Sequence, residues 1–213
     1  MLSSFPTDLP AISLAVFVAL GLLSVLTVTI AIFKIMQFAR MGVGQHKLAQ
    51  AILDDWLNGR PDEAQRKATA SHAVLPRVLS ATMSGLRARP ADPSYCEDLA
   101  RQVALTQLIQ MGSWMRLLDA VVQMAPMLGL LGTVIGMIDA FGNLALSQDM
   151  ADPRLLASGI WTALATTATG LAIALVAYFV AAWLEGRIEL ERQSMELAVS
   201  TAIHGQVAVP AAR

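Results

Sequence analysis

Hydroxyl side chains inside two long apolar stretches are the residues of this sequence most able to do chemistry. The stretches carry Thr133, Thr162, Thr166 and Thr167. A polar group within a membrane is costly unless it faces a partner helix or a water-filled cavity. A threonine hydroxyl does not ionise near neutral pH, so it can orient water or a protonated carboxyl but cannot itself bind and release protons. The pattern indicates helix faces that meet either a partner helix or a water-filled cavity.

Helical periodicity places these hydroxyls on narrow stripes of small residues. The first stripe comprises Pro126, Gly129, Thr133, Gly136 and Ala140, at steps of three and four residues. The later stretch has Ala163, Thr167, Gly170 and Ala174 on one stripe, and Thr162, Thr166 and Thr169 on the neighbouring one. Pairs such as Gly132 and Gly136 also serve close helix packing, and a threonine can bond to a carbonyl one turn back. Spacing alone therefore leaves a packing face and an ion path both open.

Depth in the membrane favours the ion path. If the two helices meet the outer surface near Ala145 and Ala157, Thr133 lies about 18 Å and Thr167 about 15 Å below it, at about 1.5 Å per residue. Two hydroxyls then sit near the midplane at similar heights.

Asp139 is the one acid that we expect within the bilayer. It lies near the outer end of its span, on the stripe of Gly132, Gly136 and Asn143. An acid at this depth either reaches headgroups and water or guides proton entry from the periplasmic side. The second hypothesis predicts that Asp139→Asn slows or abolishes proton conduction.

Composition and charge indicate the elements that position these residues. Of the 213 residues, 55% are hydrophobic and 15% are charged, and the mean hydropathy is +0.57. An ordinary soluble domain has about 25% charged residues, so the chain falls in the membrane class. Three uncharged stretches exceed or match the length that crosses a bilayer, which predicts an all-α integral membrane protein with three transmembrane helices and a helical cytoplasmic domain.

The predicted organisation follows from these stretches. It comprises a short periplasmic N-terminus (1–8), transmembrane helix 1 (9–33), a cytoplasmic helical segment (34–116), transmembrane helix 2 (117–145), a periplasmic connection (146–154), transmembrane helix 3 (155–184), and a cytoplasmic C-terminal helix and tail (185–213). Lysine and arginine set the direction, because none precedes the first span whereas Lys34 and Arg40 follow it and Arg187 and Arg192 follow the third. Asp152-Pro153 predicts a helix start.

The segments outside the spans are predicted to be helical. The middle segment has apolar residues at helical spacing, with breaks predicted at 58–61 and at 89–93, where glycine and proline occur. The tail from Glu185 to about Gln206 mixes apolar and charged residues, which favours a solvated helical extension of the third span over a dedicated docking site.

Several function classes are excluded or disfavoured. A net charge of -1 with pI near 6.3 offers no basic surplus for nucleic acid. No nucleophile elbow, zinc-protease motif or phosphate loop is present, so we expect no enzyme. The histidines are far apart and Cys96 is the only cysteine, so we expect no metal site, no disulfide and no cofactor.

Two segments carry a family resemblance. The sequence APMLGLLGTVIGM at 125–137, followed by ALATTATGL at 163–171, resembles the signature of the MotA/TolQ/ExbB proton channel family. MotA-type members have four spans, so three favour the ExbB/TolQ branch. In that family Thr133 and Thr167 match pore-lining threonines, Pro126 matches a proline of the second span, and Thr162 stands where a glutamate is frequent.

The resemblance implies partners and a location. The expected assembly is a homopentamer in the bacterial inner membrane, in contact with lipid. It encloses the helices of ExbD- or TolR-like single-span proteins that carry an intramembrane aspartate. Proton flow through it drives a TonB- or TolA-like periplasm-spanning protein that energises outer-membrane transport or integrity. The alternative is a passive membrane scaffold that assembles single-span partners without conducting ions; spacing does not decide whether the ion is H⁺ or Na⁺.

Overall fold

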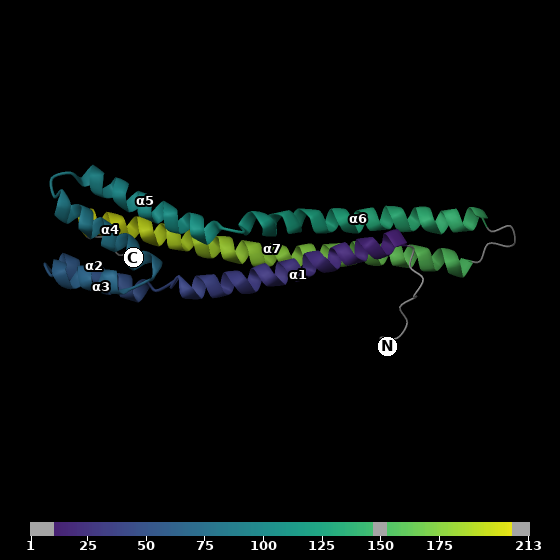
Figure 1. The fold of residues 1–213 in the computed structure, drawn as a ribbon, viewed down its shortest axis with the longest axis horizontal. Helices are drawn as coiled ribbons and strands as arrows, with labels where there is room; N and C mark the ends of the chain where they lie inside the picture. The colour runs from purple at the N-terminus through teal and green to yellow at the C-terminus, as the bar shows by residue number, and fades with distance from the viewer. Residues whose placement is uncertain (1–10, 147–152, 206–213) are drawn as a thin grey trace, which may run out of the picture. The chain divides into compact units, whose positions relative to one another are not determined.

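The computed structural model describes residues 11–146 and 153–205, and every regular element in these ranges is an α-helix (Figure 1). This confirms the predicted all-α class. The helices are α1 (Ala11–Arg40), α2 (His46–Leu57), α3 (Pro61–Ala70), α4 (Val74–Ala88), α5 (Pro93–Gly112), α6 (Met115–Leu146) and α7 (Pro153–His204). The predicted periplasmic N-terminus and most of the predicted periplasmic connection lie outside the described residues.

Three segments of the described chain are long and apolar enough to cross a membrane, which confirms the predicted number of spans. They centre on α1, α6 and α7, and α7 alone has 52 residues. At 1.5 Å per residue α7 is about 78 Å long, more than twice the roughly 30 Å hydrocarbon core, so much of it extends beyond the membrane. Its exposed Trp161 and Trp183 lie about 33 Å apart along the helix, a spacing that suits aromatic side chains at the two membrane surfaces.

The chain divides into two compact units, which we describe separately. The span unit comprises Met1–Ile32 and Trp114–Ala182, and the polar unit comprises Phe33–Ser113 and Trp183–Arg213. Helices α1 and α7 each contribute residues to both units.

The span unit packs small and branched side chains between its three helices and leaves large apolar ones outside. Val16 and Leu20 of α1 form a buried cluster with Ala125 of α6 and Ala174 of α7. Large side chains such as Met127 are exposed. So large an apolar surface is unfavourable in contact with water, so we expect lipid or other helices to cover the unit.

The polar unit contains α2 to α5, and its helix ends follow from the sequence. Helix α2 ends at Leu57 and α3 begins at Pro61, with Gly59 between them at φ +73°. Helix α5 begins at Pro93, and Asp92 caps it by accepting a hydrogen bond from the backbone N–H of Tyr95. Both predicted breaks therefore coincide with helix ends.

Polar contacts hold the polar unit together. The Trp56 indole of α2 donates to the Ala202 carbonyl of α7 (3.1 Å). Lys34 is 0% exposed, and its ammonium donates to the Met111 carbonyl at the end of α5 (2.8 Å). A cation at a helix C-terminus is favourable because the last carbonyls lack helical partners.

The buried Asp55 forms a second set of contacts in the polar unit. Its carboxylate bonds to Lys67 of α3 and pairs with Arg60 at 2.9 Å. The hydrogen bond from Lys67 is the main reason that the pKa of Asp55 is lowered, and the charges of Lys67 and Arg60 act in the same direction against burial. The ionised carboxylate is therefore part of the folded structure.

The tail continues the third span as a helix, as predicted, but one face of it is buried rather than solvated. Helix α7 does continue to His204, but Glu191, Met195, Ala198 and Ala202 are buried. These residues lie three or four positions apart, so they form one face that packs inside the polar unit. Two of its three apolar members, Ala198 and Ala202, have short side chains, and the charged residues between them concealed the pattern.

Candidate ion pathway and helix interface

Helices α6 and α7 meet through glycines that admit no side chain. A Cβ built at Gly132 would lie 2.5 Å from the hydroxyl oxygen of Thr166, and one at Gly136 would lie 2.9 Å from the Ala163 Cβ. A Cβ at Gly170 would lie 2.5 Å from the backbone oxygen of Ala125. Real Cβ atoms do not approach other atoms this closely, so glycine is required wherever the neighbouring atoms cannot move. The small residues thus let the two helices approach as in other membrane helix pairs.

Two threonines of α7 meet one carbonyl of α6. The Thr167 hydroxyl donates to the Gly129 oxygen at 2.8 Å. The Thr166 hydroxyl is 3.3 Å from the same oxygen and 2.6 Å from the Ala163 oxygen. Because a hydroxyl has a single proton, Thr166 donates to the nearer Ala163 carbonyl and Thr167 provides the stronger link between the helices.

The other candidate hydroxyls bond within their own helices. Thr133 donates to the Leu130 carbonyl (2.6 Å) and Thr162 to the Ser158 carbonyl (3.0 Å). Carbonyls cannot donate, so each of these hydroxyls gives its proton to the backbone and keeps its lone pairs as acceptors.

Burial separates Thr166 from the other predicted pathway residues. Thr166 is 1% exposed and faces Gly132, so within one subunit its hydroxyl belongs to the helix interface. Thr133, Thr162 and Thr167 are half-buried, and Thr169, on the same predicted stripe as Thr166, is exposed. Each of these three residues is therefore partly exposed in the single subunit.

Pro126 and Asp139 occupy opposite parts of α6. Helix α6 continues through Pro126, which has no N–H to donate, next to the buried Ala125 whose carbonyl meets Gly170. Asp139 is half-buried, and its Oδ2 atom is inaccessible to solvent and lacks a hydrogen-bond partner in the described structure. An acidic oxygen without a partner is costly to bury, so this oxygen has an unfilled position for a hydrogen-bond donor.

Sequence reasoning missed part of the helix interface. A Cβ at Gly159 would lie 2.6 Å from the Ala140 Cβ, which extends the contact toward the C-terminal end of α6. Gly159 is four residues before Ala163 and could have been found by extending the small-residue stripe back one turn. Helix α1 packs on Ala125 and Ala174 through Val16 and Leu20, and no pattern in α1 singled out these two residues.

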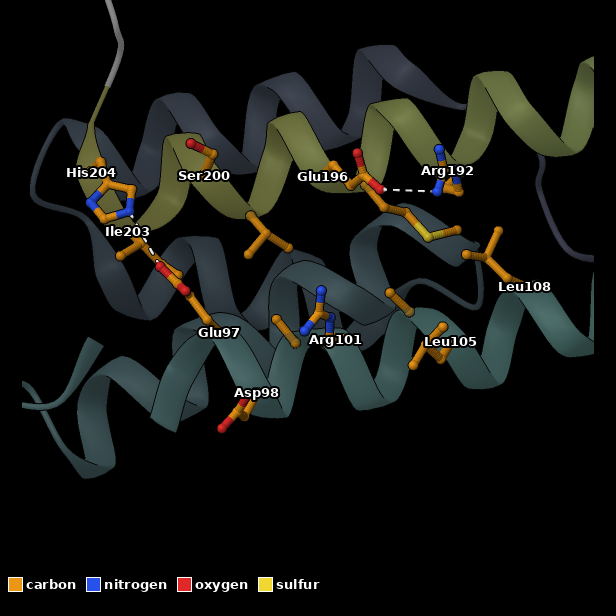
Figure 2. Close-up of a pocket in the computed structure, with 14 residues that line it drawn as sticks. Glu97, Asp98, Arg101, Leu105, Leu108, Arg192, Glu196, Ser200, Ile203 and His204 are labelled. Atoms are coloured by element: carbon orange, nitrogen blue, oxygen red, sulfur yellow. Dashed lines mark ion pairs between the residues drawn. The ribbon is translucent and has the colours of Figure 1, made fainter. Parts of the chain in front are cut away.

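A groove in the polar unit is lined by none of the predicted site residues. It has a volume of about 450 Å³ between α5 and the last turns of α7, and apolar and charged side chains share its walls (Figure 2). His204 pairs with Glu97 at 3.4 Å, and Arg192 with Glu196 at 3.6 Å (Figure 2). Acidic and basic groups alternate there, so the groove has no single charge preference.

Comparison with known proteins decides the family. The family model described as the MotA/TolQ/ExbB proton channel family matches residues 70–197, which is more than half of the chain. The chain belongs to this family. The match confirms the resemblance in the sequence and includes α6 and most of α7.

Individual members of the ExbB group support the same assignment. A protein of Methanothermobacter thermautotrophicus named "Putative biopolymer transport protein ExbB homolog" is 30% identical over 180 residues, covering 84% of this chain and 61% of that protein. A Synechocystis protein named "Putative biopolymer transport protein ExbB-like 1" is 30% identical over 177 residues, which cover 82% of this chain and 67% of that protein. "Biopolymer transport protein exbB1" of Vibrio cholerae is 42% identical over 86 residues, 40% of this chain and 38% of its own. The chain thus spans about three fifths of the Methanothermobacter relative.

Proposed function

We propose that this chain is the channel-forming stator subunit of a proton-driven, ExbB/TolQ-like motor in the bacterial inner membrane. Membership of a proton channel family and relatives named as biopolymer transport proteins support this function. In the proposed orientation the N-terminus is periplasmic and the C-terminus cytoplasmic. The subunits form a homopentamer around ExbD- or TolR-like single-span partners, and the complex drives a TonB- or TolA-like protein.

The observation that carries the proposal is the α6–α7 pair. It presents half-buried hydroxyls at Thr133 and Thr167, whereas residues 120–138 and 155–184 contain no Asp, Glu, Lys, Arg or His. Such a surface can hold water or a protonated carboxyl but has no group that carries a proton at neutral pH. A partner helix with an aspartate supplies the missing group, and burial among hydroxyls lets that acid alternate between its neutral and charged forms.

Asp139 extends the proposed path toward the periplasm. Its unpartnered Oδ2 lies seven residues before the end of α6, or about 10 Å along the helix. In the proposed orientation, the acid receives protons that enter from the periplasmic side. Asp139→Asn, which removes the charge and keeps the shape, should slow partner-dependent proton flux at equal expression, and unchanged flux would remove Asp139 from the path.

Proton flux into liposomes tests the function. The chain is reconstituted with and without an ExbD- or TolR-like partner under an imposed pH gradient, and wild type is compared with Thr133→Val and Thr167→Val. Valine keeps the shape of threonine and removes its hydrogen bonds, so partner-dependent flux should be lost. Thr169→Val is the matched control, because Thr169 is exposed on α7 and bonds only to its own helix.

A passive scaffold is the second candidate. It is favoured by the glycine contacts between α6 and α7 and by the bonding of the threonine hydroxyls to backbone carbonyls. A scaffold predicts assembly with the partner, no flux in wild type, and no functional effect of either valine substitution. Assembly without flux would therefore replace the channel proposal with the scaffold.

A further inference from the structure

A buried carboxyl group lies in the polar unit, outside the proposed ion path. Glu191 of α7 is seven residues past Leu184, where the uncharged stretch of α7 ends. The residue is 1% exposed. Its Oε2 atom accepts a hydrogen bond from the backbone N–H of Gly44 at 3.1 Å, whereas Oε1 is inaccessible to solvent and has no hydrogen-bond partner. Only half of this carboxyl group is satisfied.

The Gly44 amide belongs to the tight loop between α1 and α2, residues 41–45. Gly42 and Gly44 have φ angles of +62° and +88°, in the left-handed region that glycine adopts without strain. A Cβ at Gly42 would lie 2.7 Å from the Ala73 Cβ, and the Met41 carbonyl accepts from the Val74 N–H at 3.1 Å. The loop is thus held on one side by the start of α4 and on the other by Glu191.

Two other charged groups act on Glu191 in the described structure. His46 at the start of α2 and Arg187 one turn earlier in α7 favour the ionised carboxylate, but both side chains are exposed. Burial is the largest influence and raises the pKa of Glu191. The Gly44 hydrogen bond and these two charges act in the opposite direction but are weaker. An ionised carboxylate with one unpaired buried oxygen is much costlier than a neutral carboxyl in the same place.

We propose that Glu191 is a proton-binding site whose neutral form holds the α1–α2 loop on α7 and whose ionisation releases the loop. Its ligand is the proton, since the closed surroundings of Oε1 admit nothing larger. The site goes beyond the proposed channel function, because it lies outside the α6–α7 path and acts on loop docking. It would operate equally in a scaffold.

The direction of the pH effect follows from linkage. Glu191 binds the proton more tightly when the loop is docked than when the loop is released and Glu191 contacts water. Docking is therefore favoured at low pH and weakens as pH rises from the ordinary glutamate pKa, about 4.3, through the raised pKa of the docked state.

Hydrogen exchange of the loop amides tests the site in the full-length chain in nanodiscs. Protection factors for residues 41–45, corrected for the pH dependence of intrinsic exchange, are compared at about pH 5.5 and about pH 8. Wild-type protection should fall by at least about threefold at the higher pH. Glu191→Gln, an uncharged isostere that can still accept from Gly44, should show high protection at both pH values.

Two matched variants separate this site from its neighbours. Glu189→Gln changes an exposed acid of α7 that pairs with Arg192 at 3.1 Å, and it should keep the wild-type pH dependence. His46→Gln removes the other titratable group near the carboxyl and should also keep it. Equal wild-type protection at both pH values, persistence of the effect in Glu191→Gln, or its loss in His46→Gln would each overturn the proposal. If Glu191→Gln does not fold, wild type and His46→Gln still decide.

Discussion

Replacing Gly170 by alanine should destabilise the α6–α7 pair relative to the same replacement at an unpacked position of α7. The added Cβ would lie 2.5 Å from the Ala125 carbonyl oxygen and 3.1 Å from the Gly129 Cα. Both contacts are backbone atoms, so relief requires the helices to move apart. Overpacking of this kind costs about 1–3 kcal/mol.

A matched control isolates that cost. Gly186 lies in the same helix, and a Cβ there meets nothing within 4 Å. Both substitutions bring the same change in intrinsic helix propensity, up to about 1 kcal/mol in favour of alanine. Gly170→Ala should therefore be less stable than Gly186→Ala by about 1–3 kcal/mol, which corresponds to roughly a 5- to 150-fold change in the unfolding equilibrium.

Stability is measured by reversible unfolding in mixed micelles, followed by helical circular dichroism. Flux in the liposome assay provides a second measurement, since a widened α6–α7 pair displaces the Thr167 hydroxyl from Gly129. Equal stability of the two variants would show that the helices do not pack as closely as described, and the assignment of Gly170 to the interface would then fail.

Three further substitutions test individual contacts. Thr167→Val should destabilise the span unit by about 1 kcal/mol in the same unfolding experiment, because the hydrogen bond to Gly129 is lost, and an unchanged midpoint would contradict that bond. Asp55→Asn should lower the melting temperature at about pH 7, with a difference that shrinks toward about pH 3, because the Lys67 hydrogen bond lowers the pKa of Asp55 and its stabilisation is lost as pH falls through that lowered pKa. A pH-independent difference would refute this explanation. Trp56→Phe removes the indole bond to the α7 backbone and should speed limited proteolysis of α2 by about fivefold, from about 1 kcal/mol; equal cleavage rates would exclude a role for that bond.

The parts of the fold that the sequence predicts well depend on strong local signals. Long uncharged stretches predict spanning helices. Gly59 marks a helix end because it adopts φ +73°, which other residues rarely do, and Pro93 marks a helix start because it has no N–H to donate to a preceding turn. The turn after α5 gave no such signal. Trp114 adopts φ +68° there, a conformation that is uncommon for a large side chain.

The candidate site is harder to predict because periodicity fixes a stripe but not what it faces. Thr166 and Thr169 share a stripe, yet one is buried against Gly132 and the other is exposed. Glu191 and Glu189 are two residues apart in a charged helix, and only Glu191 is buried. These differences arise from long-range contacts that no local pattern records.

The direction of the threonine hydrogen bonds has a consequence for the proposed channel. The hydroxyls of Thr133 and Thr167 donate hydrogen bonds to the Leu130 and Gly129 carbonyls. Their oxygens can therefore act only as hydrogen-bond acceptors toward other groups. A ring of such oxygens favours a neutral carboxyl group, which can donate a hydrogen bond, and disfavours a carboxylate, which cannot. The surface would therefore select for the protonated form of a passing side chain. An acid that binds a proton before it passes and releases that proton afterwards would move one proton per step. An uncharged wall of this kind can couple motion to proton flow without titrating at all.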